Sequence, residues 1–201
     1  MNAVAVEPLL FALDQPSVVE GLRRSPVLLA ASVRRPVTRA VRLTFFDTPA
    51  GDLARRRFAL GLYDDGRRRL RAVRRLDGLA SAAIPVPDRP MANGAAAPDL
   101  AGLDLAPAVA DAVATALQPI AEARLRRTVW TLAHRAARLV LVLDDGDLAV
   151  QDRREPVRDA TLLHQDGAVE ALEDFARTLA VSVPLAPRSS RLEQRACTPP
   201  G

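Results

Sequence analysis

Lysine is absent from this chain of 201 residues, so all 28 of its Lys and Arg side chains are arginines. A guanidinium group stays protonated and can hold a phosphate or a carboxylate through two parallel hydrogen bonds. It cannot lose its proton to act as a general base, and it does not form a Schiff base. The sequence therefore excludes every mechanism that needs a catalytic lysine.

Cysteine and aromatic residues are scarce as well. Cys197 is the only cysteine, which excludes a disulfide within the chain and makes a reducing compartment the natural location. Aromatic residues make up only 3% of a chain that is 49% hydrophobic, so the core must consist mainly of alanine, valine and leucine. A chain of this length can bury such a core as one domain.

Signals for export and membrane insertion are also missing. The first residues have no basic start or cleavage site, and no apolar run approaches the roughly 18 residues that span a bilayer. The net charge is only +4, the arginines are spread along the chain, and few aromatic residues are present to stack on bases. We therefore expect a soluble cytoplasmic protein that contacts no membrane and binds no specific nucleic acid.

Short apolar or alternating segments dominate the first part of the chain and predict β-strands. One short helix is expected over Ser17–Arg24, between two prolines. Proline, glycine and alanine concentrate over residues 85–107, which predicts a long connection between the two halves of one domain. The predicted strands are residues 3–13, 35–47, 55–65, 67–78 and 80–87.

The second half is expected to begin with a helix over residues 108–117 and to continue mainly as strands. A hairpin turn is predicted at Asp145–Gly146, and residues 187–201 should add a last strand that ends in a disordered tail over 197–201. The predicted strands of this half are residues 122–132, 137–145, 146–154 and 157–167.

An amphipathic helix is expected over Val169–Leu179, because Leu172, Phe175, Ala176 and Leu179 follow helical spacing. We expect it to pack on the sheet. Eight to ten strands with few helices favour an antiparallel barrel or sandwich with helical additions, which is an α+β fold.

The motif FFDTP at Phe45–Pro49 and the order of the segments after it resemble the CYTH superfamily, the triphosphate tunnel metalloenzymes. Inorganic triphosphatases, thiamine triphosphatase and class IV adenylyl cyclases belong to this superfamily. The other motifs that carry the resemblance are DDGDL at 144–148, VRDATLLHQDG at 157–167, the helix after it, and SRLEQR at 190–195. The match covers residues 1–196 as a single CYTH-like domain, and its specificity lies in the order and spacing of the motifs.

The resemblance implies an eight-stranded antiparallel β-barrel closed into a tunnel, with flanking helices. Inward-facing basic residues would hold a triphosphate, and inward-facing carboxylates would hold Mg²⁺ or Mn²⁺. This arrangement is physically reasonable, because alternate residues of a barrel strand face the interior and hard divalent cations bind carboxylate and phosphate oxygens.

The resemblance carries three candidate metal ligands and four candidate anion ligands onto this chain. Further carboxylates of the family pattern are replaced at Leu9, Val140, Thr161 and Leu163, and two arginines are replaced at Gly61 and Tyr63. Apolar side chains at Leu9, Phe11, Val140 and Leu163 would line the tunnel, which predicts a metal site that has decayed. The remaining candidates are Glu7, Asp144 and Asp159 for a metal, and Arg74, Arg124, Arg127 and Arg191 for the anion.

Several residues have a simpler structural interpretation. Asp47 in FFDTP is expected to cap a turn and a short helix, and Arg55–Arg57 are expected to lie on a solvated helix face. Arg124 and Arg127 are three residues apart, which places them on opposite faces of a regular strand unless a bulge intervenes. His134 and His164 have no neighbouring cysteine or paired histidine, so a zinc site is not predicted.

Two functions remain open from the sequence. The first is a degenerate CYTH-like protein without catalytic residues or a required cofactor, which binds a phosphorylated anion of the triphosphate or polyphosphate type or acts as an interaction module. The alternative is a triphosphatase that uses Mg²⁺ or Mn²⁺ to hydrolyse inorganic triphosphate or a nucleoside triphosphate.

Overall fold

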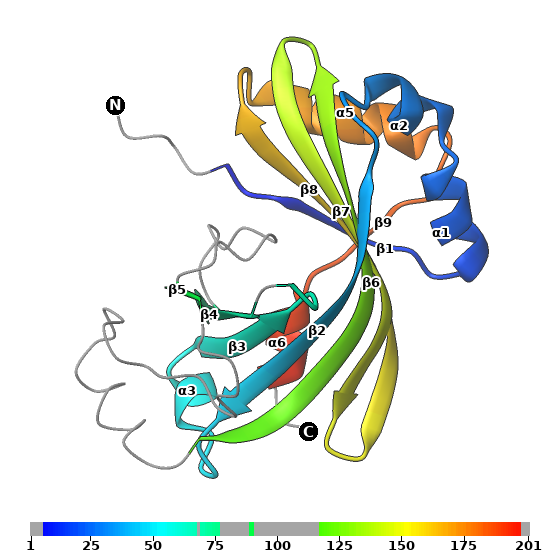
Figure 1. Ribbon diagram of the computed structural model, residues 1–201. Helices are drawn as coiled ribbons and strands as arrows, with labels where there is room; N and C mark the ends of the chain where they lie inside the picture. Colours follow the sequence, from blue (N-terminus) through cyan, green and yellow to red (C-terminus); the bar gives the residue numbers. More distant parts are fainter. Residues whose placement is uncertain (1–5, 68, 77–88, 91–116, 198–201) are drawn as a thin grey trace.

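A nine-stranded antiparallel sheet forms the body of the protein (Figure 1). The computed structural model describes residues 6–67, 69–76, 89–90 and 117–197. The strand order across the sheet is β5-β4-β3-β2-β6-β7-β8-β1-β9. The strands are β1 (Leu9–Ala12), β2 (Val37–Asp47), β3 (Phe58–Asp64), β4 (Arg69–Arg75), β5 (Arg89–Pro90), β6 (Gln118–His134), β7 (Ala137–Val150), β8 (Arg153–Asp166) and β9 (Ala186–Pro187).

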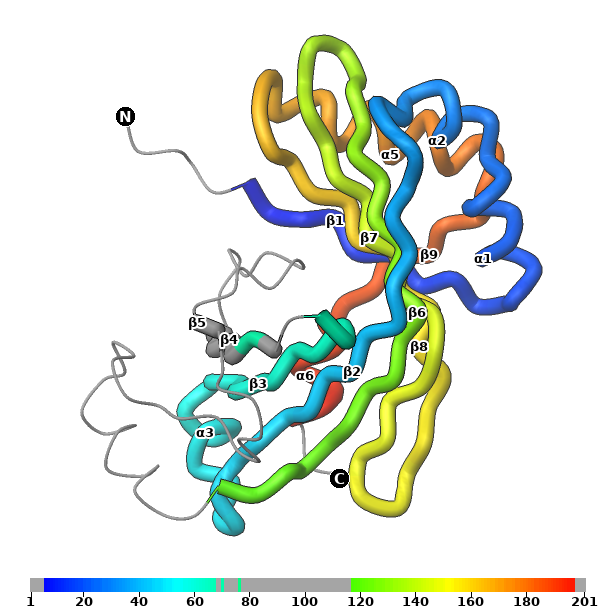
Figure 2. Tube along the Cα trace, viewed as in Figure 1, coloured from blue at the N-terminus to red at the C-terminus, as the bar shows by residue number. Residues whose placement is uncertain are grey.

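The helices divide between the two ends of this twisted sheet (Figure 2). Three of them gather beside the upper ends of β6, β7 and β8, and two lie against the lower half near β2 and β3. The upper group is α1 (Pro16–Arg23), α2 (Pro26–Ala31) and α5 (Glu170–Ala180), and the lower group is α3 (Asp52–Arg55) and α6 (Leu192–Cys197). Among the described residues, no helix has the length and apolar character needed to cross a membrane.

The larger apolar core lies between the upper helices and one face of β6, β7 and β8. Trp130, Leu141 and Leu162 from the strands are fully buried there, together with Phe175 of α5. The amphipathic helix predicted over 169–179 is therefore confirmed, and it packs on the sheet as expected.

The other face of the sheet is concave, and α6 covers its lower half. Leu192, Ala196 and Cys197 are buried against side chains such as Leu125 and Val157. The prediction of a final strand over 187–201 is thus wrong beyond Pro187, and Cys197 ends a packed helix, while residues 198–201 lie outside the described part. The four-residue spacing of Leu192 and Ala196 is the helical signal that the proline-rich and serine-rich surroundings obscured.

The hairpin predicted at Asp145–Gly146 is also wrong, because β7 runs without interruption from Ala137 to Val150. The chain turns instead at Gln151, whose φ of 51° is left-handed. At Gly146 a Cβ atom would overlap the carbonyl oxygen of Arg124 on the neighbouring strand. The glycine permits a close approach of two backbones within the sheet rather than a turn.

Closure of the sheet into an eight-stranded barrel is not among the described pairings. The described strands form a sheet with two edges, β5 and β9. The predicted strand over 80–87, the helix over 108–117 apart from Leu117, and the connection over 85–107 apart from β5 fall outside the described residues.

Asp47 is the capping residue that the FFDTP motif predicts. Its side chain is only 2% exposed and accepts hydrogen bonds from the backbone N–H groups of Thr48 (2.7 Å), Leu53 (2.8 Å) and Ala54 (3.0 Å). The first turn of α3 and the preceding turn are therefore joined through one carboxylate, which positions α3 beside the end of β2.

Substitution of Asp47 by asparagine should lower the free energy of unfolding by about 2 kcal/mol, because the amide nitrogen cannot accept a hydrogen bond and leaves a buried N–H unsatisfied. Urea denaturation measures this loss. The matched control is Asp14→Asn at an exposed position, where a change below about 0.5 kcal/mol is expected. Equal effects of the two substitutions would contradict the capping role.

Candidate functional site

A row of charged residues crosses the concave face from strand to strand. Arg39 of β2 lies opposite Arg127 of β6, which lies opposite Asp144 of β7, which in turn lies opposite Asp159 of β8. Directly opposite residues of paired strands share one face of the sheet, so the four side chains lie side by side. Arg188 and Arg195 reach the same row from outside these strands. We call these six residues the charged belt.

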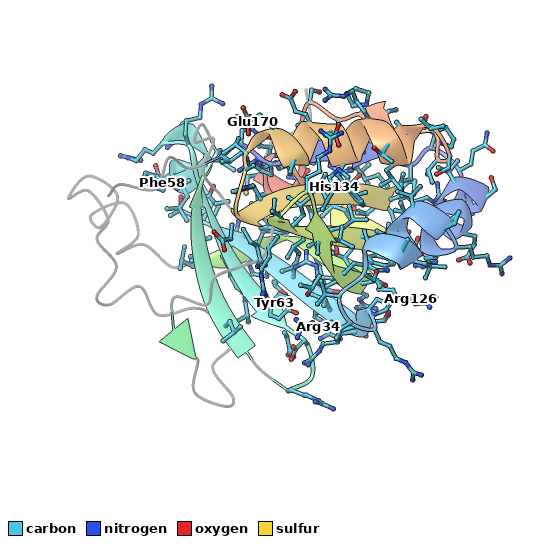
Figure 3. The ribbon with its side chains drawn as sticks, turned by 90° about the horizontal axis from the view of Figure 1, so that it is seen from above. Arg34, Phe58, Tyr63, Arg126, His134 and Glu170 are labelled. Atoms are coloured by element: carbon cyan, nitrogen blue, oxygen red, sulfur yellow. The ribbon has the colours of Figure 1, made fainter. Side chains whose placement is uncertain are left out.

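Arg127 and Asp144 form a bidentate ion pair in the middle of the charged belt. The Nε and Nη2 atoms of Arg127 lie 2.6 and 2.7 Å from the two carboxylate oxygens, and the side chains are only 9% and 13% exposed. Burial alone would lower the pKa of Arg127, but attraction to Asp144 and the hydrogen bonds to it outweigh burial and raise the pKa. The Arg127 guanidinium also lies 5.9 Å from the ring centre of Tyr63, a β3 residue labelled in Figure 3.

Asp159 lies between two guanidinium groups. Arg188 Nε is 2.7 Å from one carboxylate oxygen, and Arg195 donates a short hydrogen bond to the other. Arg195 also donates to Glu155 at 3.1 Å. Burial raises the pKa of Asp159 to about 6, against the opposing attraction of Arg195 and Arg188. The carboxylate is therefore held in place by arginines at a cost in desolvation.

Two donors of the charged belt make no hydrogen bond within the part of the chain that the structure describes. The Nε atoms of Arg188 and Arg195 are buried, and neither makes a hydrogen bond to a described residue. Arg188 Nε is close enough to Asp159 for an ion pair, but the alignment of the two groups does not satisfy a hydrogen bond. Buried guanidinium N–H groups without an acceptor are costly, and the Oδ1 atom of Asp159 beside them likewise accepts no hydrogen bond from a described residue.

The raised pKa of Asp159 gives the stability of the protein a particular dependence on pH. The folded state binds this proton more tightly than the unfolded state, so the stabilisation is fully present below about pH 4 and is lost as the pH rises through about 6. The loss should amount to about 3 kcal/mol between these limits. It is measured as the difference in unfolding free energy between the wild type and Asp159→Asn at pH 4.5, 6 and 7.5.

In that comparison the wild type should lose stability relative to Asp159→Asn as the pH rises. A difference that stays constant, or that changes in the opposite direction, would mean that the two guanidinium groups outweigh burial. The asparagine variant lacks the titrating group, while all other titrations are common to both proteins and cancel.

Three of the predicted site residues converge, and Arg124, Arg191 and Glu7 do not. Arg127, Asp144 and Asp159 meet in the charged belt. Arg124 lies on the opposite face of β6, 67% exposed and paired with Glu122 at 2.6 Å, as the offset of three residues predicts. Arg74 lies in β4 opposite Ala59.

Arg191 and Glu7 take positions outside the row. Arg191 lies immediately before α6, and its backbone N–H donates to Gln194 Oε1 at 2.7 Å. Glu7 is exposed before β1 and lines a cavity with Glu170 and Glu173 of α5. In β1 it is Ala12, five residues further along, that lies opposite Asp159.

Leu9 and Phe11 do not line the concave face, contrary to the prediction. They lie opposite Leu162 and Ala160 and pack on the helix side of the sheet. In a strand, a shift of one residue moves every side chain to the other face, so the alignment of β1 to the family pattern was wrong by an odd number of residues. Val140 and Leu163 do lie on the concave face, where they pack together in a small apolar cluster.

Sequence reasoning missed Arg39, Arg188 and Arg195. A signal existed for Arg39, because it shares the alternation of Val41, Leu43 and Phe45 along one strand. Arg195 was hidden because its segment was interpreted as a strand, and its contact with Asp159 spans 36 residues of chain.

The residues that the structure describes do not fit a divalent metal centre. Both carboxylates of the charged belt are already engaged by guanidinium groups, and Glu7 lies elsewhere. Within the described ranges, no group of three or more His, Cys, Asp or Glu side chains could hold a metal ion. Magnesium and manganese need several oxygen ligands at short distance, and an arginine in direct contact with each carboxylate competes with them.

Comparison with known proteins gives matches at the level of fold. No family model matches the sequence, and no curated protein matches it. The structure resembles a putative adenylyl cyclase, HpAC1 from Hippeastrum, described as having a dominant triphosphatase activity, with 16% identity, a TM-score of 0.60, and 93% of this chain and 92% of that chain covered. It also resembles a putative adenylate cyclase from Bacillus halodurans, with 11% identity, a TM-score of 0.55, and 97% and 98% covered. The chain therefore shares its fold with these two proteins, as the resemblance in the sequence predicted.

Proposed function

We propose that this chain binds a polyphosphate-type anion on the concave face of its sheet and does not hydrolyse it through a divalent metal. The observation that carries the proposal is the pairing of Asp144 and Asp159 with arginines of the chain itself. In a CYTH-like site these carboxylates would hold the metal ion. Here guanidinium groups of the chain provide the positive charge in its place. Fixed positive charge stays available for an anion without a bound ion.

Supporting evidence comes from the two buried donors of the charged belt. The Nε–H groups of Arg188 and Arg195 flank Asp159 and have no hydrogen-bond partner among the described residues. Phosphate oxygens are strong acceptors for such groups, and a phosphate can accept two parallel hydrogen bonds from one guanidinium. A closed tunnel is part of the same proposal, although the described strands leave β5 and β9 as edges of the sheet.

Phosphate release from tripolyphosphate, measured with and without Mn²⁺ or Mg²⁺, tests the proposal together with a thermal-shift titration by the same compound. We expect stabilisation by tripolyphosphate without turnover. Arg188→Gln should raise the tripolyphosphate concentration that gives the half-maximal thermal shift about tenfold, because a charge-assisted hydrogen bond is lost. The matched control is Arg124→Gln on the opposite face, which should bind as the wild type does.

The alternative is a working metal-dependent triphosphatase, which the fold shared with the triphosphatase from Hippeastrum supports. Turnover that requires Mn²⁺ and that is abolished by Glu7→Ala or by Asp159→Asn would establish this alternative. Neither turnover nor a thermal shift with any polyphosphate would reject both functions and leave an interaction module.

A further inference from the structure

A second cavity lies at the lower end of the sheet, on the far side of α6 from the charged belt. Its volume is about 530 Å³, within the range of small-molecule binding sites. It is lined by the FFDTP turn, α3, the C-terminal end of α6, the start of β6 and the turn after β7. Arg195 faces Asp159 in the charged belt, whereas Ala196 and Cys197 line this cavity, so α6 separates the two sites.

The floor of this cavity is apolar and its rim is polar. The rim carries Arg55, Arg57, Gln118 and Gln151, all of which are exposed. Burial raises the pKa of the Cys197 thiol on the floor to about 12, so this group is neutral and contributes no charge at neutral pH. The floor is formed by Ala54, Leu76, Ile120, Val150, Ala196 and Cys197.

The carboxylates near this cavity are compensated. Asp47 also lines it, but its oxygens accept three backbone N–H groups. Arg55 is paired with Asp52 at 2.5 Å. Arg57 is different, since its guanidinium lines the cavity and forms no ion pair with any residue that the structure describes.

Arg57 also holds a backbone conformation that is unfavourable for a residue with a side chain. Its φ is 61°, in the left-handed region. Two backbone hydrogen bonds hold it there, from its N–H to Ala54 (2.9 Å) and from Leu76 to its carbonyl oxygen (2.7 Å). Glycine or asparagine would take this conformation at lower cost, and an arginine here places a cation at the cavity.

We infer that this cavity binds a small organic anion that carries an extended apolar body, with Arg57 holding the anionic head and the floor accepting the apolar part. A single guanidinium at the rim suits one carboxylate or one phosphate monoester rather than a chain of phosphates. The shape of the lining thus selects an amphiphile, which differs from the polyanion proposed for the charged belt.

Isothermal titration calorimetry with n-octyl phosphate below its micelle concentration tests the inference. We expect one molecule bound per chain, and a loss of about fourfold in affinity for each methylene removed in the hexyl and butyl esters. Inorganic phosphate and octanol should each bind far more weakly. Octanoate distinguishes the two head groups, and binding of either octyl anion supports the inference.

Arg57→Asn is the decisive variant, because asparagine tolerates a positive φ and the fold is retained. It should weaken the binding of octyl phosphate about tenfold and leave weak octanol binding unchanged. Arg56→Asn is the matched control, since Arg56 is exposed next to Arg57 and does not line the cavity. Ile120→Trp should fill the floor and abolish binding while Arg57 remains.

Three results would overturn the inference: affinity independent of chain length, unchanged affinity in Arg57→Asn, or unchanged affinity in Ile120→Trp. The Arg188→Gln variant of the charged belt should bind octyl phosphate normally. Failure at this cavity and failure of the proposed polyphosphate site are therefore measured separately.

Discussion

Substitution of Arg127 by methionine should lower the free energy of unfolding by about 3–5 kcal/mol, because it leaves Asp144 buried without its counter-charge. The ion pair is bidentate and neither side chain is more than 13% exposed, so solvent cannot replace the guanidinium. Methionine keeps most of the apolar stem, which makes the lost charge the main difference. Urea denaturation at pH 7.5 measures the change.

A double-mutant cycle tests whether the two residues are coupled. It combines Arg127→Met with Asp144→Leu and compares the double variant with each single variant. The double variant should recover most of the stability lost by either single one, because a buried ion pair can be replaced by apolar side chains at little cost. Arg124→Met, three residues away but exposed, should change stability by less than about 0.5 kcal/mol. Additive effects of the two belt substitutions would show that the pair is not coupled.

This cycle also bears on function. If Asp144 depends on Arg127 for its charge balance, a divalent cation can bind Asp144 only by displacing a buried guanidinium. The same holds for Asp159, which contacts Arg188 and Arg195. The charged belt thus has the carboxylates of a metal site, but its arginines provide the positive charge.

Local signals in the sequence predicted part of this structure. Asp47 followed by Thr-Pro predicted a cap, and the cap is present. The spacing of Leu172 and Phe175 predicted α5. Both features are set by residues close together in the chain, where backbone geometry and side-chain spacing determine the outcome.

Features that depend on distant pairing could not be predicted in the same way. The face occupied by Leu9 is set by the register of β1 against β8, and an error of one residue reverses it. One partner of Asp159 is Arg195, on a helix whose position depends on the apolar core beneath it. Gly146 follows two aspartates, a sequence that is typical of a hairpin turn. Its role in allowing the close approach of β6 is visible only from the position of that neighbouring strand.

Substitution of Gly146 by alanine should lower the free energy of unfolding by more than about 4 kcal/mol, an exceptional effect for one methyl group. The new Cβ would overlap the Arg124 carbonyl oxygen and lie 3.0 Å from the Arg124 carbonyl carbon and from Leu125 Cα. All three are backbone atoms of β6, which pairs with β7 at Leu125 and Gly146, so relief requires separation of these two long strands. Thermal and urea denaturation measure the loss.

Gly21→Ala is the matched control, because Gly21 lies in α1 and a Cβ there meets nothing within 4 Å. Alanine should raise the free energy of unfolding there by about 0.5–1 kcal/mol, through its higher helix propensity. The two Gly→Ala changes are thus expected to have opposite signs. Near-wild-type stability of Gly146→Ala would mean that β6 and β7 do not approach as described, and the alignment of Arg127 with Asp144 two residues away would have to be reconsidered.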